Sequence, residues 1–181
     1  MFMPEGNYNF KYDRKLILMV GNIGSGKTTY IKNLNQEYVT LSIDKMRYMM
    51  GNGDYIFSYQ LEEPIWQAEL KLFKELIKKG INIVIDEINT NKNMRNRYIY
   101  NMLALTWECN KYEVTAVVMP KLSMKESVRR RLKQPHGDST RKNWEMIWKK
   151  FDENYTAPTL EESFNKIIML DENYKIKEII E

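Results

Sequence analysis

Cysteine and histidine are almost missing from this chain of 181 residues, which contains only Cys109 and His136. A single cysteine excludes a disulfide framework and a cysteine-rich zinc site. His136 stands alone in a segment with proline and glycine, where a histidine is more often exposed than catalytic. We therefore assign neither residue a role in chemistry.

Long hydrophobic runs are also absent. No segment approaches the length of a transmembrane helix, and residues 1–14 lack the apolar core of a signal peptide. These absences predict a cytoplasmic protein without a membrane partner. The content of 43% hydrophobic and 29% charged residues is that of a globular protein, and the length predicts one domain over 1–181, with 1–14 as a loosely attached arm.

The charge of the chain is unevenly distributed. The net charge is +4, but residues 121–150 hold ten Lys or Arg against three acids, which leaves +7 there and −3 in the rest. A concentrated cationic segment suits a polyanion or a triphosphate. A solvated helical face is the plainer alternative.

A phosphate-binding loop is the strongest signal in the sequence. The apolar run 16–20 predicts a buried strand, and 21–28 then fits G-x-x-x-x-G-K-[ST]. Glycines let backbone N–H groups surround an anion, and the following helix adds the positive end of its dipole. Lys27 would reach the β- and γ-phosphates, and the Thr28 hydroxyl would bind Mg²⁺. The residues expected to bind ATP here are Gly21, Asn22, Ile23, Gly24, Ser25, Gly26, Lys27, Thr28 and Thr29.

Apolar strands alternate with helical patterns along the rest of the chain. Strands are expected at 16–20, 38–43, 81–87, 112–120 and 166–170, and the tail 175–180 fits a strand or a helix. Helices are expected at about 27–36, 44–50, 59–79, 91–109, 123–132 and 140–154. This order predicts an α/β fold of the P-loop NTPase type, a three-layer α/β/α sandwich with a central parallel sheet of about five strands. Its ligands should lie at the carboxyl ends of the strands.

Two acidic residues that follow strands are candidates for phosphoryl transfer. Asp86 fits a strand-end acid that holds Mg²⁺ together with Thr28, and Glu87 is its rival for that role. Asp44 fits a general base that takes the proton of an attacking hydroxyl. Arg47, one helical turn later, could hold an anionic group of the acceptor, although an ordinary surface ion pair has the same spacing.

Basic and aromatic residues complete the list of candidates. The run 129–133 could close over the phosphates as part of a lid at about 129–142, with an arginine stabilising the charge of the transition state. Four aromatic residues could stack on nucleobases or belong to the core, and these are Tyr55, Phe57, Tyr59 and Trp66.

Four blocks within about 15–155 carry a family resemblance: GNIGSGKTTY, SIDKMRYMM, IVIDEINTNKNMR and VRRRLKQPHGDSTRKNWEMIWKKFDENY. The chain resembles the kinase module of the bacteriophage 5′-hydroxyl polynucleotide kinases, in the zeta-toxin-like branch of P-loop kinases. The resemblance implies that Asp44 activates the 5′-hydroxyl and that Arg47 binds the 3′-phosphate of the terminal nucleotide. Because the chain shows no D-x-D-x-T motif, the resemblance implies a kinase without a 3′-phosphatase domain. Such a kinase would lie in the host cytoplasm if it is phage-encoded.

The lid departs from the family pattern. Arg130 falls on the first of two spaced family arginines, but Gln134 falls on the second. The candidates to replace it are Lys133, Arg131, Arg129 and Arg141.

We therefore expect an ATP- and Mg²⁺-dependent kinase that acts on 5′-hydroxyl ends of DNA or RNA, with no protein partner. Lys27, Asp44, Arg47 and Arg130 would be catalytic, Arg131 and Lys133 would join the loop in binding ATP, and Thr28 and Asp86 would hold the metal. The alternatives are a kinase for a nucleoside, sugar or antibiotic hydroxyl and a nucleotide-binding regulatory module, because fold and site do not fix the acceptor.

Overall fold

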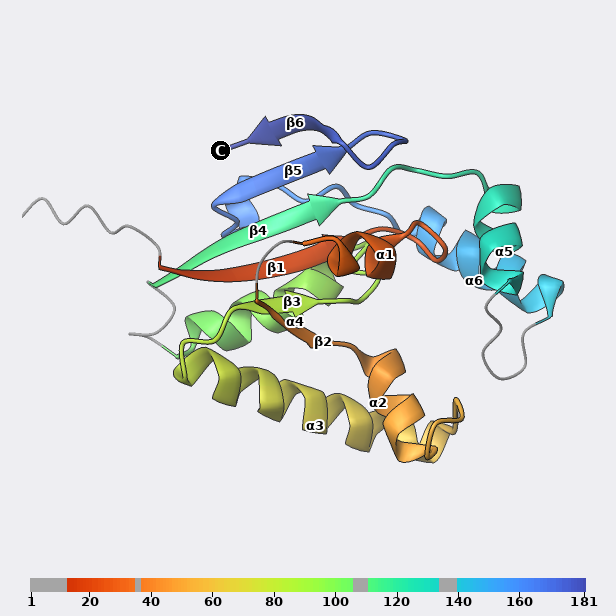
Figure 1. Cartoon of the computed structure of the whole chain (residues 1–181), viewed down its shortest axis with the longest axis horizontal. Helices are drawn as coiled ribbons and strands as arrows, with labels where there is room; N and C mark the ends of the chain where they lie inside the picture. Colours follow the sequence, from red (N-terminus) through yellow and green to blue (C-terminus); the bar gives the residue numbers. More distant parts are fainter. Residues whose placement is uncertain (1–12, 35–36, 106–110, 134–139) are drawn as a thin grey trace, which may run out of the picture.

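A six-stranded sheet forms the centre of the protein, in the order β2-β3-β1-β4-β5-β6 (Figure 1). The computed structural model describes residues 13–34, 37–105, 111–133 and 140–181. Neighbouring strands from β2 to β5 pair in parallel, and β6 pairs antiparallel with β5. The bounds are β1 Arg14–Val20, β2 Val39–Leu41, β3 Ile83–Ile85, β4 Tyr112–Val118, β5 Lys166–Leu170 and β6 Ile176–Ile180.

Helices cover both faces of the sheet, so the predicted α/β fold with five parallel strands is confirmed (Figure 1). One face packs on apolar residues of α3 (Tyr59–Lys78) and α4 (Lys92–Leu103), and the other packs on α1 (Lys27–Lys32). Side chains of β1 alternate between the two cores, with Leu16 and Leu18 on one face and Ile17 and Met19 on the other. Two-sided burial explains why β1 reads as an unbroken apolar run.

Three further α-helices lie beyond the carboxyl ends of the parallel strands, and a short 3-10 helix, η2 (Leu160–Glu162), precedes β5 (Figure 1). The three α-helices are α2 (Ile43–Met50), α5 (Met124–Leu132) and α6 (Arg141–Glu153). A third apolar cluster joins α5 and α6 to the phosphate loop through Ile23, Val128 and Trp144. Among the described residues, no helix has the length and apolar composition needed to cross a membrane.

Side-chain caps set where several helices begin. The side chains of Ser42, Asn91, Ser123 and Thr140 each accept a hydrogen bond from the backbone N–H three residues later. The cap at Ser42 corrects one expectation: the second strand ends at Leu41, and Ile43 and Asp44 already lie in the first turn of α2.

Other element ends also differ from the expected ones. The first helix ends at Lys32 instead of 36, and the fourth ends at Leu103 instead of 109. Arg14, expected in the N-terminal arm, begins β1, and the tail forms a strand, which adds a sixth member to the sheet. Residues 1–12 of the expected arm, residues 134–139 of the expected lid with Gln134 and His136, and Cys109 lie outside the described residues.

Candidate active site

The phosphate loop connects β1 to α1 and depends on its glycines. Gly24 and Gly26 have φ angles of 66° and 98°, and Gly26 caps α1 in the left-handed conformation. A Cβ on Gly24 would lie 2.5 Å from the carbonyl oxygen of Ser127, and one on Gly26 would lie 2.7 Å from the Tyr174 hydroxyl. The loop therefore passes close to α5 and to the β5–β6 turn, and only glycine fits at these two positions.

Other residues of the phosphate loop anchor the loop to α5 and α6. The Asn22 amide donates to the carbonyl of Trp148 on α6, 3.0 Å away. Ile23 is buried with Val128 and Trp144, and Ser25 is buried within the loop. Thr29 is exposed on α1. The loop is thus held in shape by residues of α5 and α6.

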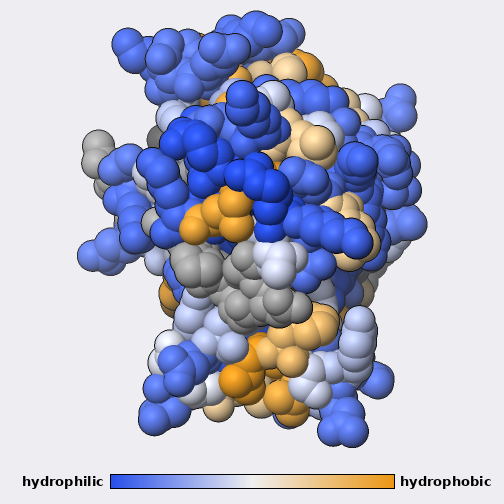
Figure 2. Space-filling view, turned by 90° about the vertical axis from the view of Figure 1, so that its right-hand side faces the viewer, coloured by the Kyte–Doolittle hydropathy of each residue, from blue (hydrophilic) through white to orange (hydrophobic). Residues whose placement is uncertain are grey.

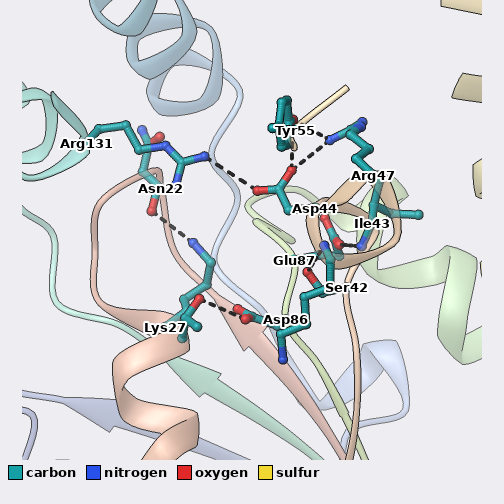
Figure 3. Close-up of polar contacts among 12 residues, drawn as sticks. Asn22, Lys27, Ser42, Ile43, Asp44, Arg47, Tyr55, Asp86, Glu87 and Arg131 are labelled. Carbon is teal, nitrogen blue, oxygen red and sulfur yellow. Dashed lines mark hydrogen bonds and ion pairs between the residues drawn. The ribbon is translucent and has the colours of Figure 1, made fainter. Parts of the chain in front are cut away.

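Lys27 curls back over the loop. Its Nζ donates to the carbonyl oxygens of Gly21 at 2.7 Å and Asn22 at 3.0 Å (Figure 3). Part of the side chain is exposed, but burial around the ammonium, together with the nearby Arg131 charge, lowers the Lys27 pKa to about 8. Asp86, Glu87 and Asp44 act in the opposite direction. A phosphate at this position would stabilise the ammonium form.

Thr28 and Asp86 form a donor pair suited to a hard cation. The Thr28 hydroxyl donates to Oδ2 of Asp86 over 2.8 Å, and Asp86 is buried where the chain leaves β3. Mg²⁺ typically takes one or two carboxylates and completes its shell with phosphate oxygens and water. The described residues contain no group of three or more His, Cys, Asp or Glu that could hold a metal without such help. The donor chemistry therefore fits Mg²⁺ bound together with a triphosphate.

Glu87 turns away from this pair and caps α2. Its Oε1 accepts a hydrogen bond from the backbone N–H of Ile43 over 2.6 Å. Burial, together with the charges of Asp44, Glu69 and Asp86, raises the pKa of Glu87 to about 8 against the opposing effect of that hydrogen bond. Sequence reasoning considered Glu87 only as a metal ligand and missed its contact with the helix that carries Asp44.

Asp44 lies at the meeting point of three donors (Figure 3). Its Oδ1 accepts from Arg47 Nη1 at 2.8 Å and from the Tyr55 hydroxyl at 3.1 Å, and its Oδ2 lies 3.5 Å from Arg131 Nη2. The Asp44 side chain is 41% exposed, so a hydroxyl could still approach it. The charge of Asp44 also acts on Lys27 of the phosphate loop. The structure thus brings the loop, Asp86 and Asp44 together, as the strand-end rule predicts.

Arg47 is more than one half of a surface ion pair. Besides Asp44 it binds Glu62 of α3, with Nε 3.0 Å and Nη2 2.6 Å from the two carboxylate oxygens. The rings of Tyr55 and Phe57 lie 5.7 Å and 5.6 Å from its guanidinium carbon. Sequence reasoning missed Glu62, and its position as an acid in the first turn of α3 was the available signal.

The basic residues of α5 diverge. Arg131 stacks 4.7 Å from the ring of Trp144 and reaches Asp44, whereas Arg130 binds Glu126 and the Tyr174 hydroxyl beside Gly26. The other candidates stay outside this site: Arg129 pairs with Glu126, Arg141 pairs with Glu145, and Lys133 is exposed at the end of α5.

Comparisons with known proteins agree with this fold. The chain is 28% identical over 163 residues to the “Putative bifunctional polynucleotide phosphatase/kinase” of Acanthamoeba polyphaga mimivirus, covering 89% of this chain and 34% of the viral protein. The chain thus spans about a third of that relative.

Two solved structures share the fold at lower identity. One, from the PezAT toxin-antitoxin system of Streptococcus pneumoniae, has a TM-score of 0.64 at 16% identity and covers 92% of this chain and 70% of that one. Another, from the Pnkp1/Rnl/Hen1 RNA repair complex, has a TM-score of 0.62 at 22% identity and covers 88% of this chain and 49% of that one.

The AAA_33 family model, described as an AAA domain, matches residues 16–157. The chain therefore belongs to the AAA_33 family of AAA domains.

Proposed function

We propose that this protein transfers the γ-phosphate of ATP to the 5′-hydroxyl end of DNA or RNA. The observation that carries the proposal is the position of Asp44, whose carboxylate lies between Arg47 and Arg131 and acts on Lys27. A base beside a phosphate loop is the arrangement that transfer to a hydroxyl requires. The similarity to the mimivirus phosphatase/kinase supports the polynucleotide acceptor.

The chain's own residues divide the reaction between them. The loop N–H groups and Lys27 hold the triphosphate. Thr28 and Asp86 would hold Mg²⁺, which would supply neutralisation of phosphate charge. Asp44 takes the proton of the 5′-hydroxyl as the bond from that oxygen to the γ-phosphorus forms and the bond to the β-phosphate oxygen breaks. ADP leaves with the electron pair of the broken bond. Arg131, which already lies beside Asp44, stabilises charge on the phosphoryl group in transit.

A small hydroxylated acceptor is the second candidate, and one observation favours it. Arg47 already carries a two-point ion pair with Glu62, so the acceptor side is not an open cationic patch. An acceptor without a phosphate would leave this pair undisturbed. The same loop, base and metal ligands would serve either acceptor.

The test is transfer of labelled γ-phosphate from ATP to 5′-hydroxyl DNA and RNA oligonucleotides, with the wild type and Asp44→Asn compared. Loss of a general base should lower kcat by about 10²- to 10⁴-fold while ATP binding is kept. Asp152→Asn is the matched control, because Asp152 also forms an ion pair, with Lys121, but lies outside the site.

Two outcomes separate the candidates. Absence of transfer to every oligonucleotide end, with ATP still bound, would overturn the polynucleotide proposal and direct the search to small acceptors. If transfer occurs, a salt series distinguishes the acceptor types, because affinity for a polyanion falls steeply with salt and affinity for a neutral acceptor does not.

A further inference from the structure

Apolar side chains gather on the surface next to Asp44. Four large ones lie within the short stretch 49–59, which ends α2 and begins α3, and they are Met49 (70% exposed), Met50 (46%), Phe57 (55%) and Tyr59 (89%). Figure 2 shows an apolar area on the lower part of this face, where α2 and the following connection lie. Exposed apolar clusters of this kind commonly mark binding sites.

Two of the four aromatic residues considered for base stacking are engaged in other contacts. Tyr55 is tied into the hydrogen-bond network of Asp44 and Arg47, and Trp66 lies 4.1 Å from the guanidinium of Arg97. Phe57 and Tyr59 remain, both exposed to solvent. We call these two residues the aromatic ledge.

The aromatic ledge is continuous with the acceptor side of the site. Arg47 contacts Asp44 at 2.8 Å, and its guanidinium carbon lies 5.6 Å from the Phe57 ring. The rings of Phe57 and Tyr59 meet edge to face at 5.4 Å. A path of contacts therefore leads from the proposed base outward over two aromatic rings.

We propose that the aromatic ledge binds the unpaired nucleobases next to the 5′-hydroxyl of a single-stranded acceptor. The inference rests on the proposed function and names the form of its substrate. Aromatic side chains stack on any base, because every base has a π-face, and a base inside a duplex has both faces covered by its neighbours. Stacking is worth about five- to a hundredfold in affinity per base, and the flexible Met49 and Met50 beside the rings can adapt to different bases.

The experiment removes the rings and the bases separately. Wild type and the double variant Phe57→Ala/Tyr59→Ala are compared on two 5′-hydroxyl single strands, one normal and one with abasic sugars at its first two positions. Tyr100→Ala is the control, because Tyr100 is a 60% exposed tyrosine on the distant helix α4. ATP binding by every variant verifies that the loop is intact.

We expect the wild type to show at least a tenfold higher KM for the abasic strand and the double variant to show equal KM values for both strands. The salt dependence of binding should be unchanged in the double variant, because the rings contact no phosphate. Equal KM values of the wild type for the two strands would overturn the proposal that the aromatic ledge binds bases. An increase in the KM of the double variant that is the same for both strands would overturn it too.

Failure of the proposed function gives a different result. In that case no strand is phosphorylated, and binding of a fluorescent single strand is measured directly by polarisation. Equal affinities of the wild type and the double variant in that measurement would overturn the inference about the aromatic ledge as well.

Discussion

Arg47 and Glu62 form a two-point ion pair, with Nε to Oε1 at 3.0 Å and Nη2 to Oε2 at 2.6 Å. The pair joins α2 to α3, and the two side chains are only 11% and 22% exposed. A carboxylate held in this way uses the same edge of the guanidinium that would hold a phosphate. Under the proposed polynucleotide function, a 3′-phosphate of the acceptor would compete with Glu62 for Arg47.

Glu62→Gln should make Arg47 more available to phosphate. The amide keeps the shape of the side chain but loses its charge, so the KM for an acceptor with a 3′-phosphate on its terminal sugar should fall by about tenfold, equivalent to about 1.4 kcal/mol. The KM for the same acceptor without that phosphate should hardly change. Glu75→Gln is the matched control, because Glu75 is an exposed partner of Lys78 on the same helix. A rise in both KM values would show instead that Glu62 only positions Arg47.

Tyr174 should position Arg130 next to the phosphate loop. Its hydroxyl accepts a hydrogen bond from Arg130, and its backbone has an unusual φ of 60°, in a turn that the Asp171 side chain fixes by accepting from two backbone N–H groups. Strained residues in well-fixed turns often serve function. Tyr174→Phe should lower kcat about tenfold with little change in the Kd of ATP.

A double-mutant cycle separates this role from simple packing. If Tyr174 acts through Arg130, then Tyr174→Phe should have no further effect on kcat in an Arg130→Ala background. Independent, additive losses would contradict a shared role.

ATP binding should take up a proton above pH 8. Burial lowers the Lys27 pKa to about 8, so at higher pH the free protein holds a neutral Lys27, while bound phosphate favours the ammonium. Affinity for ATP should therefore fall as pH rises beyond about 8, by up to tenfold per pH unit. Calorimetry in buffers of different ionisation enthalpy measures the uptake at pH 8.5. Lys27→Arg should bind without it, since arginine stays charged.

The sequence predicts the parts of the site that follow from periodicity and strand order. The phosphate loop, Asp44 and Asp86 come together because they follow parallel strands whose carboxyl ends share one edge of the sheet. The partners of these residues could not be predicted in the same way. Glu62 and Tyr174 belong to other elements, and no spacing in the sequence relates them to Arg47 or Arg130.

The lid arginines show a second limit of sequence reasoning. Neighbouring residues on a helix point about 100° apart, so Arg130 and Arg131 must face different sides. Which of them faces Asp44 depends on the rotation of α5, which is set by the burial of Val128 against Ile23 and Trp144. The structure places Arg131 there, although the family pattern draws attention to Arg130.

Glu87 should make the stability of the protein depend on pH. Burial raises its pKa from 4.5 to about 8, so between these values the folded state holds a proton that the unfolded state has lost. The free energy of unfolding should therefore fall as pH rises from about 4.5 to about 8. Glu87→Gln is neutral throughout and still offers an acceptor to the N–H of Ile43. The free energy of unfolding of the variant, measured with urea, should match that of the wild type near pH 4.5 and exceed it at pH 8.

Glu75→Gln should instead follow the wild type across this range, because the ion pair with Lys78 lowers the pKa of Glu75 and moves its titration below the window. Parallel curves for the wild type and Glu87→Gln would mean that Glu87 titrates at its ordinary pKa in the folded protein.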